Sequence, residues 1–217
     1  MHVTPETPMT ELLIMPPRVD PASAEATPAP PWLALLEPFY RRLGLALPPM
    51  TRLDPHELCP PYLQLLAHSD DMTPTLERFY GGRLHLRVLS RECSAETYRR
   101  EVVLELNHRR RPVEYGAIGI HLQHLPEEAR RIVLDERHPF GRILQTEAIA
   151  HLSWPQAFFS VHSDTHMSQL LGARNPAVLY GRRNVVVDGR RRLLADVVEI
   201  LAPVPESPSP SHENQPS

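Results

Sequence analysis

The sequence predicts a single α+β domain built on an antiparallel β-sheet. Segments with strand character outnumber helical ones, and several of them follow one another across short polar turns, as in hairpins. The helical segments occur in blocks and do not alternate strictly with strands, which favours an antiparallel sheet over a parallel, doubly wound one. The length of 217 residues is typical of one domain, or of one domain with tails.

The distribution of proline predicts where the folded part begins and ends. Of the 25 prolines, eight lie in residues 1–31 and five in residues 203–217. Such segments bury too little apolar surface to order themselves. We therefore expect a disordered Pro-rich segment over 1–31, a folded domain over 32–203 and a disordered tail over 204–217.

Three short helices are predicted in the first third of the domain. Apolar residues from Leu33 to Tyr40 have near-helical spacing, although Pro38 interrupts them. A second helix spans Pro61 to His68. A third begins at Thr73, a suitable N-cap with proline after it, and runs to Tyr80, where Gly81-Gly82 ends it.

The middle of the chain predicts strands. Arg83 to Val88 alternates with period two. Tyr98 to Leu106 and Val113 to Leu122 are strand-like and flank a polar turn at 107–110, so they are expected to form a hairpin.

The last third predicts helices first and a hairpin at the end. One helix begins at Pro126 and another after Pro139, and Ala157 to Val161 is expected to be extended. Ser163-Asp164 is suited to cap a helix that ends at Leu171. The final hairpin is the clearest: Val178 to Val187, the turn Asp188-Gly189, and Leu193 to Leu201.

Composition excludes several functions. All 23 basic residues are Arg, so Schiff-base and P-loop lysine chemistry are impossible. A formal net charge of −3 argues against a general nucleic-acid or membrane binder. Cys59 and Cys93 are too few for a disulfide framework or a cysteine zinc site, and they fit a reducing cytoplasm. No membrane span, signal peptide, Gly-rich phosphate loop or G-x-S-x-G elbow is evident.

Histidine and arginine clusters have ordinary interpretations. His162 and His166 are four residues apart, and His121 and His124 three apart, so either pair could share a face. Because no H-E-x-x-H pattern supports them, we expect exposed or hydrogen-bonded histidines and no metal site. The arginine triplets at 109–111 and 190–192 sit at hairpin turns, where solvated charges are the expected interpretation and an anion site is the alternative.

Two charged residues in apolar strands are candidates for a binding site. By alternation, either Arg99 or Arg100 points to the covered side of the sheet, and a buried guanidinium requires an anion, either an internal Glu or a ligand carboxylate. Glu199 shares a strand face with Val197 and Leu201. It is a candidate for a raised pKa and proton transfer, for a salt bridge with an arginine, or for an exposed face of the strand.

Two turns that lead into helices are candidate anion sites. Pro139-Phe140-Gly141-Arg142 and Asp70-Asp71-Met72-Thr73 both place exposed backbone N–H groups at a helix start. Each alone is also an ordinary cap.

Taken in order, these segments resemble the chorismate pyruvate-lyase family, in its divergent bacterial and archaeal branch. The resemblance covers roughly residues 60–203. Its motifs are the following: Asp71-Met72-Thr73, Arg100-Glu101-Val102-Val103-Leu104, Pro139-Phe140-Gly141-Arg142-Ile143-Leu144, Tyr180-Gly181-Arg182-Arg183 and Val198-Glu199-Ile200-Leu201-Ala202-Pro203.

The resemblance implies a cytoplasmic enzyme with about six antiparallel strands, helices packed on one side, and a buried site under helical flaps. The implied reaction eliminates pyruvate from chorismate to give 4-hydroxybenzoate, with no metal or cofactor. Met72 and Phe140 would bind the ring carboxylate through their backbone N–H groups. Arg100 would contact the ligand carboxylate, and Glu199 would face the para oxygen and manage a proton as a general acid. Arg100 and Glu199 are thus the implied catalytic pair.

One departure concerns Ala117. The better-known branch has an arginine in this strand, which helps to hold the enolpyruvyl side, whereas Tyr115-Gly116-Ala117 has alanine. Glu114 and an arginine of the Gly181-Arg182-Arg183 segment are the candidates to alter this region.

A non-catalytic binding module is the alternative. Effector-sensing domains of some transcription regulators are similar to the implied fold and would bind an aromatic acid without turning it over. Residues 1–60 offer no convincing helix-turn-helix with a basic recognition helix. Arg100 with Glu199 favours the enzyme, and Ala117 favours the sensor. Neither the oligomeric state nor the downstream pathway follows from the sequence.

Overall fold

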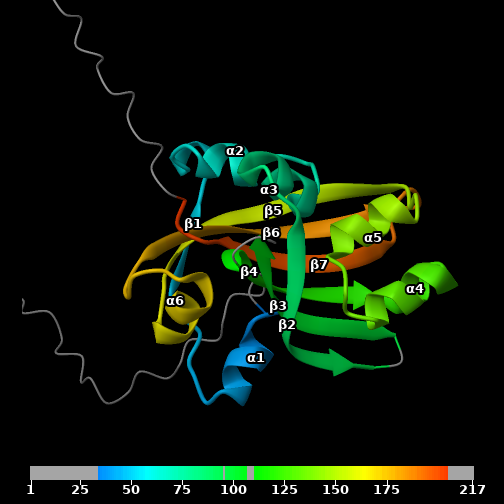
Figure 1. Ribbon diagram of the computed structural model, residues 1–217, viewed down its shortest axis with the longest axis horizontal. Coiled ribbons are helices and arrows are strands. Elements are labelled where there is room, and N and C mark those ends of the chain that lie inside the picture. The colour runs from blue at the N-terminus through cyan, green and yellow to red at the C-terminus, as the bar shows by residue number, and fades with distance from the viewer. Residues whose placement is uncertain (1–33, 95, 107–109, 205–217) are drawn as a thin grey trace, which may run out of the picture.

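The computed structural model of the chain describes residues 34–94, 96–106 and 110–204 (Figure 1). The N-terminal segment expected to be disordered lies outside the described residues, and so does the expected C-terminal tail except for Val204. In the described part of the chain, no helix is long and apolar enough to cross a membrane.

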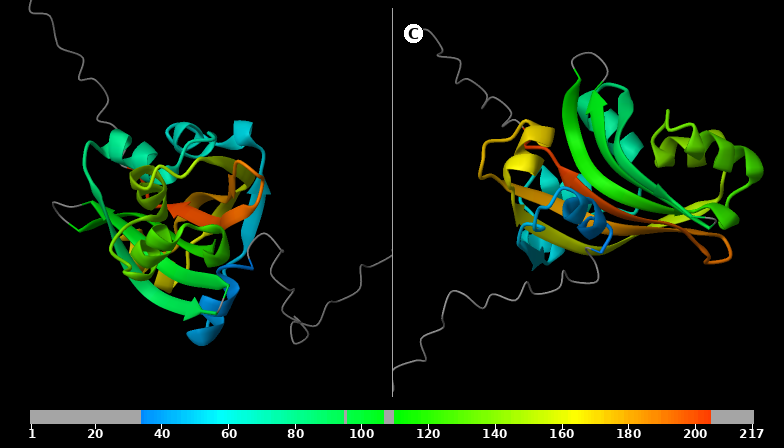
Figure 2. Two further views of the ribbon diagram at one scale, coloured as in Figure 1. Left: turned by 90° about the vertical axis from the view of Figure 1, so that its right-hand side faces the viewer. Right: turned by 90° about the horizontal axis from the view of Figure 1, so that it is seen from below.

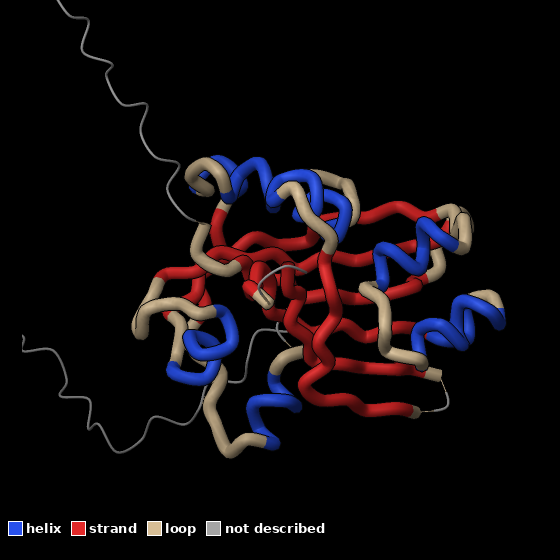
Figure 3. The backbone as a smooth tube through the Cα atoms, viewed as in Figure 1, coloured by secondary structure: helices blue, strands red, loops and turns tan. Residues whose placement is uncertain are grey.

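One antiparallel sheet of seven strands forms the framework, in the order β1-β5-β6-β7-β4-β3-β2 (Figure 3). Two perpendicular views show that it is strongly curved (Figure 2). The strands are β1 Met50–Leu53, β2 Leu84–Cys93, β3 Thr97–Leu106, β4 Arg111–His121, β5 His151–His162, β6 Val178–Asp188 and β7 Leu193–Leu201.

Short helices connect and cover the strands. They are α1 Glu37–Arg42, α2 Tyr62–Leu66, α3 Met72–Tyr80, α4 Glu127–Leu134, α5 Phe140–Thr146 and α6 Thr165–Leu171, with 3₁₀ turns at Pro55–Glu57 and Leu122–His124. The apolar sides of α2 to α5 pack on one face of the sheet in two core clusters. The α+β class, the antiparallel sheet and the helical layer on one side are confirmed, with seven strands in place of about six.

A third core cluster lies on the opposite face, beneath α1 and α6. Successive residues of β3 separate the two faces: Val103 packs with Phe39 of α1 and Met167 of α6, whereas Leu104 packs with Leu76 of α3. This follows from the period of two in a strand, which sends neighbouring side chains to opposite sides.

The seventh strand, β1, has no clear signal in the sequence. It has only four residues and follows two prolines, Pro48 and Pro49, so it is too short to show an alternating pattern. It exists because Met50 to Leu53 pair with the second half of β5, with Met50 opposite Val161. The paired residues are far apart in the sequence, so the local pattern of β1 could not predict this pairing.

Several predicted boundaries differ from the structure; for example, β2 continues to Cys93 and not to Val88. The N-cap of α3 is Asp71 and not Thr73, so Pro74 occupies the third helical position. Proline is tolerated there because the first turn of a helix has no internal partner for its N–H groups. β5 is longer than expected and contains Pro155, which has no backbone N–H to donate. Proline is tolerated there because β1 covers only Phe158–Val161, so β5 is an edge strand at Pro155.

Candidate ligand-binding cavity

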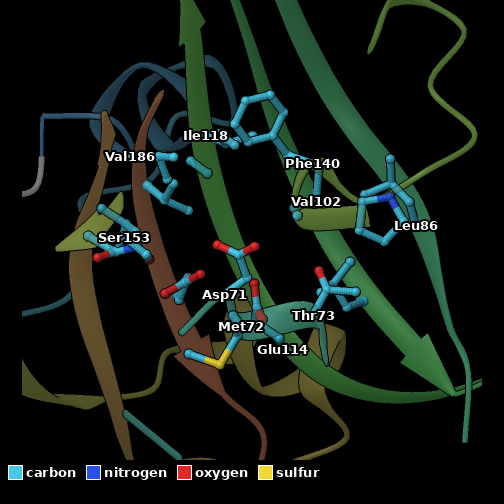
Figure 4. Close-up of a pocket in the computed structure, with 18 of the residues that line it drawn as sticks. Asp71, Met72, Thr73, Leu86, Val102, Glu114, Ile118, Phe140, Ser153 and Val186 are labelled. Carbon is cyan, nitrogen blue, oxygen red and sulfur yellow. The ribbon is translucent and has the colours of Figure 1, made fainter. Parts of the chain in front are cut away.

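A cavity of about 60 Å³ lies between the sheet and the starts of α3 and α5. This is room for a few water molecules. Every strand except β1 contributes lining residues. Figure 4 shows Phe140, Ile118 and Val186 toward one end of the hollow, and Met72 and Glu114 toward the other.

The residues predicted from the sequence meet in this cavity. Met72, Arg100, Phe140 and Glu199 all line it, although they come from α3, β3, α5 and β7. Ala117 lines it as well. The structure therefore brings the predicted set together, while the role of each residue in binding stays a prediction.

Arg100 is the buried cation of the cavity. It is 1% exposed, and burial lowers its pKa. Its Nη2 donates a hydrogen bond to the carbonyl oxygen of His138 at 3.2 Å, while Nε and Nη1 have no hydrogen-bond partner among the described residues. No carboxylate of the described chain forms an ion pair with it. Tyr98 and the charge of Glu136 stabilise the guanidinium in part. A buried guanidinium costs several kcal/mol unless an anion meets it, so the two unpaired nitrogens make Arg100 a candidate to bind one.

Two helix starts form the roof beside Arg100. Met72 is the first residue of α3 and Phe140 the first of α5, and both are buried. The first N–H groups of a helix have no partner within the helix, so those of Met72 and Phe140 are available to a ligand. The two starts converge at Gly141, where an added Cβ would lie 3.3 Å from the Cβ of Asp71.

Glu199 on the floor is held by an arginine. Its Oε2 accepts a hydrogen bond from Nε of Arg182 at 2.5 Å. Arg182 is fully buried and also donates to the carbonyl oxygens of Leu66, His68 and Asp70 in the segment that leads to α3. Of the interpretations that the sequence left open for Glu199, the structure shows the salt bridge with an arginine.

Glu114 is a second buried carboxyl at this end. It is 5% exposed, and its Oε2 has no hydrogen-bond partner in the described chain. Burial raises its pKa well above the usual range, and the nearby charge of Glu199 raises it further, against the opposing effect of Arg182.

Two polar lining residues were not anticipated from the sequence. Asn184 donates from Nδ2 to Oγ of Ser153 at 2.7 Å, and its Oδ1 has no partner in the described part of the chain. The available signal was alternation, since Arg182, Asn184 and Val186 share one face of β6.

Ion pairs fasten the roof at its rim. Nε2 of His151, at the start of β5, lies 3.0 Å from Oδ2 of Asp71, the N-cap of α3. This hydrogen bond raises the pKa of His151, and the bond to the carbonyl of Ile149 raises it too, while burial opposes both. Arg142 of α5 pairs with Glu77 of α3. These contacts tie α3 to β5 and to α5 beside the cavity.

The histidine and arginine clusters lie apart from the cavity. The rings of His121 and His124 stack with centroids 5.9 Å apart, and His166, a residue of α6, lies beside Glu101. Among the described residues, no group of three or more His, Cys, Asp or Glu is placed to bind a metal ion. The triplet 190–192 is exposed at the β6–β7 turn, and Arg109 of the other triplet lies outside the described residues.

Comparisons with known proteins give a likeness of fold alone. The sequence matches no protein-family profile and no curated protein. The structure is similar to PhnF from Mycobacterium smegmatis, with 13% identity, a TM-score of 0.46, and coverage of 61% of this chain and 63% of that one. It is similar to the effector domain of the same protein, with 13% identity, a TM-score of 0.47, and coverage of 61% and 88%. The ligand-binding domain of a putative GntR-family transcriptional regulator from Bordetella bronchiseptica has 12% identity, a TM-score of 0.43, and coverage of 54% and 85%.

The expectation of a chorismate pyruvate-lyase enzyme is wrong. These similar structures are named as a transcriptional regulator and as effector and ligand-binding domains, not as lyases. In the cavity, Glu199, which was expected to transfer a proton, forms an ion pair with Arg182. What remains of the resemblance is the antiparallel sheet under helices with an enclosed site.

Proposed function

We propose that the chain is a non-catalytic binding module whose cavity takes a small organic carboxylate. The observation that supports this most is Arg100, which is buried in the cavity wall and has two nitrogens, Nε and Nη1, without a hydrogen-bond partner among the described residues. A guanidinium presents a planar fork that matches a carboxylate, and such charge-assisted pairs are stronger than neutral hydrogen bonds. The N–H groups of Met72 and Phe140 support the same anion.

The rest of the cavity wall favours a ligand whose body is apolar. Apart from its polar groups, the cavity is lined by aliphatic and aromatic side chains, which is typical of small-molecule sites. They include Leu86, Val102, Ile118, Phe140 and Val186. An aromatic carboxylate such as benzoate combines the two properties. Because the cavity holds only a few water molecules, a ligand of this size is expected to enter only if residues of the cavity wall shift.

Calorimetric titration with benzoate tests the proposal. Wild type is compared with Arg100→Met, which keeps the volume and removes the charge. Arg99→Met is the matched control, since Arg99 is the neighbouring residue on β3 and its side chain is 48% exposed. We expect Arg100→Met to weaken benzoate binding at least about tenfold, because a hydrogen-bonded ionic contact contributes about 1.5–3 kcal/mol.

Benzamide, a neutral ligand of the same shape, is expected to bind wild type more weakly than benzoate by a similar factor. Equal benzoate affinity in the Arg100→Met and Arg99→Met variants would contradict the proposal, and so would the failure of benzoate and other small aromatic carboxylates to bind wild type.

A further inference from the structure

Glu114 lies at the end of the cavity away from Arg100. Arg100 pairs with Ile118 across β3 and β4, and Glu114 is four residues from Ile118 along β4. At the rise of a strand this separates the two positions by roughly 13 Å. Glu199, opposite Gly116 on β7, lies between them along the sheet. A ligand held by Arg100 therefore extends toward Glu114.

The buried charges in and beside the cavity favour a neutral Glu114. Arg100 and Arg182 are two buried cations, and Glu199 with a ligand carboxylate supplies two anions. An ionised Glu114 would be a further anion without a cationic partner among the described residues, because Arg182 already forms its ion pair with Glu199. Burial and the nearby Glu199 both raise the pKa of Glu114, in agreement with this balance. A neutral carboxyl carries an O–H group that can donate a hydrogen bond.

We propose that Glu114 determines the specificity of the cavity by donating a hydrogen bond to a neutral acceptor atom at the end of the ligand away from its carboxylate. A carbonyl oxygen or a ring nitrogen meets this requirement. The inference rests on the proposed function and names the ligand class more closely. A hydrocarbon end would leave the buried O–H unpaired, and a second carboxylate would meet Glu114 and Glu199 together, so both are selected against.

Two pairs of ligands of equal size test the inference by calorimetry. The first pair is isonicotinate and benzoate; isonicotinate has a ring nitrogen, the acceptor, opposite the carboxylate. The second pair is 4-formylbenzoate and 4-vinylbenzoate; the formyl group has a carbonyl oxygen, the acceptor, where the vinyl group has a CH₂. The aldehyde has no lysine to condense with, since the chain contains none. We expect wild type to bind the acceptor member of at least one pair about threefold to tenfold more tightly, the factor typical of one hydrogen bond.

Variants assign the preference to Glu114. Glu114→Gln retains an N–H donor and is expected to keep the preference, whereas Glu114→Leu is expected to bring the ratio within each pair to about one. Glu127→Gln, on the exposed surface of α4, is the control for loss of one carboxyl. Thermal unfolding verifies that each variant folds, and Glu114→Met replaces the leucine variant if that one does not.

Three results would overturn the inference. They are the lack of any preference in both pairs, a preference that persists in Glu114→Leu, and tighter binding of 4-(aminomethyl)benzoate than of 4-formylbenzoate, which would mean an ionised Glu114. If benzoate binds through Arg100 but no preference exists, only this inference fails. If benzoate binding does not depend on Arg100, the proposed function itself fails.

Discussion

Arg100 and Glu101 are neighbours on β3 and point to opposite faces of the sheet. Arg100 lines the cavity beneath α3 and α5, whereas Oε1 of Glu101 accepts a hydrogen bond from the hydroxyl of Tyr115 at 2.8 Å on the side covered by α1 and α6. Nε2 of His166 lies 3.6 Å from the same carboxylate oxygen. Two buried charges of opposite sign are thus adjacent in sequence and separated by the sheet.

This separation predicts that Tyr115→Phe affects stability and not ligand binding. The variant removes a hydrogen bond from the buried Glu101, which we expect to cost about 1–3 kcal/mol. Urea denaturation measures the loss, and benzoate titration is expected to match wild type. An unchanged denaturation midpoint would contradict the assigned hydrogen bond.

Arg182 is expected to be one of the most costly residues to replace. Arg182→Met leaves Glu199 as an unpaired buried carboxylate and frees three carbonyl oxygens, so we expect a loss of about 3–5 kcal/mol in urea denaturation. The double variant Arg182→Met with Glu199→Leu removes both charges and should recover part of that loss. A double variant less stable than Arg182→Met would contradict the ion pair.

The His151–Asp71 pair predicts a pH-dependent contribution to stability. The pKa of His151 is raised in the folded chain, chiefly by its hydrogen bond to Asp71. The unfolded residue titrates near 6.5, so the contribution is complete below about pH 6.5 and is lost as the pH rises through the higher folded value.

Unfolding free energies of wild type and His151→Gln, measured from pH 5 to 9, test this sign. The difference should be largest at low pH and shrink as the pH rises. His162→Gln, at an exposed position at the end of β5, is the control. A difference that grows with pH would contradict the assignment.

Gly116 lets β4 pass close to β7. A Cβ at this position would lie 2.0 Å from the carbonyl oxygen of Val198, and backbone cannot move aside as a flexible side chain can. We expect Gly116→Ala to destabilise the domain by about 1–3 kcal/mol or more. Gly189→Ala, where nothing lies within 4 Å, should be nearly neutral in the same thermal or urea unfolding measurement. Equal stability of the two variants would show that the strands are not so close.

Local sequence patterns predicted most of the fold and several residues that line the cavity. Alternation required that either Arg99 or Arg100 point inward, and the structure selects Arg100. The partner of Glu199 could not be predicted, because Arg182 lies on another strand and both an exposed face and a raised pKa fitted the same pattern. The single misplaced cap, Thr73 for Asp71, reflects two capping residues that lie close together in sequence.

Function was harder to predict than fold, for a physical reason. The resemblance rested on residues that build an anion-binding cavity, and binding and turnover require the same cavity. What separates them is whether Glu199 is available to the ligand, and this depends on its buried contact with Arg182, which lies on another strand.

The most direct test of the central claim is a crystal structure of the chain with 4-bromobenzoate, in which the anomalous signal of bromine locates the ligand. We expect the carboxylate within hydrogen-bonding distance of Nε or Nη1 of Arg100 and the bromine toward Glu114. A ligand outside the cavity, or one whose carboxylate leaves Arg100 unpaired, would contradict the account.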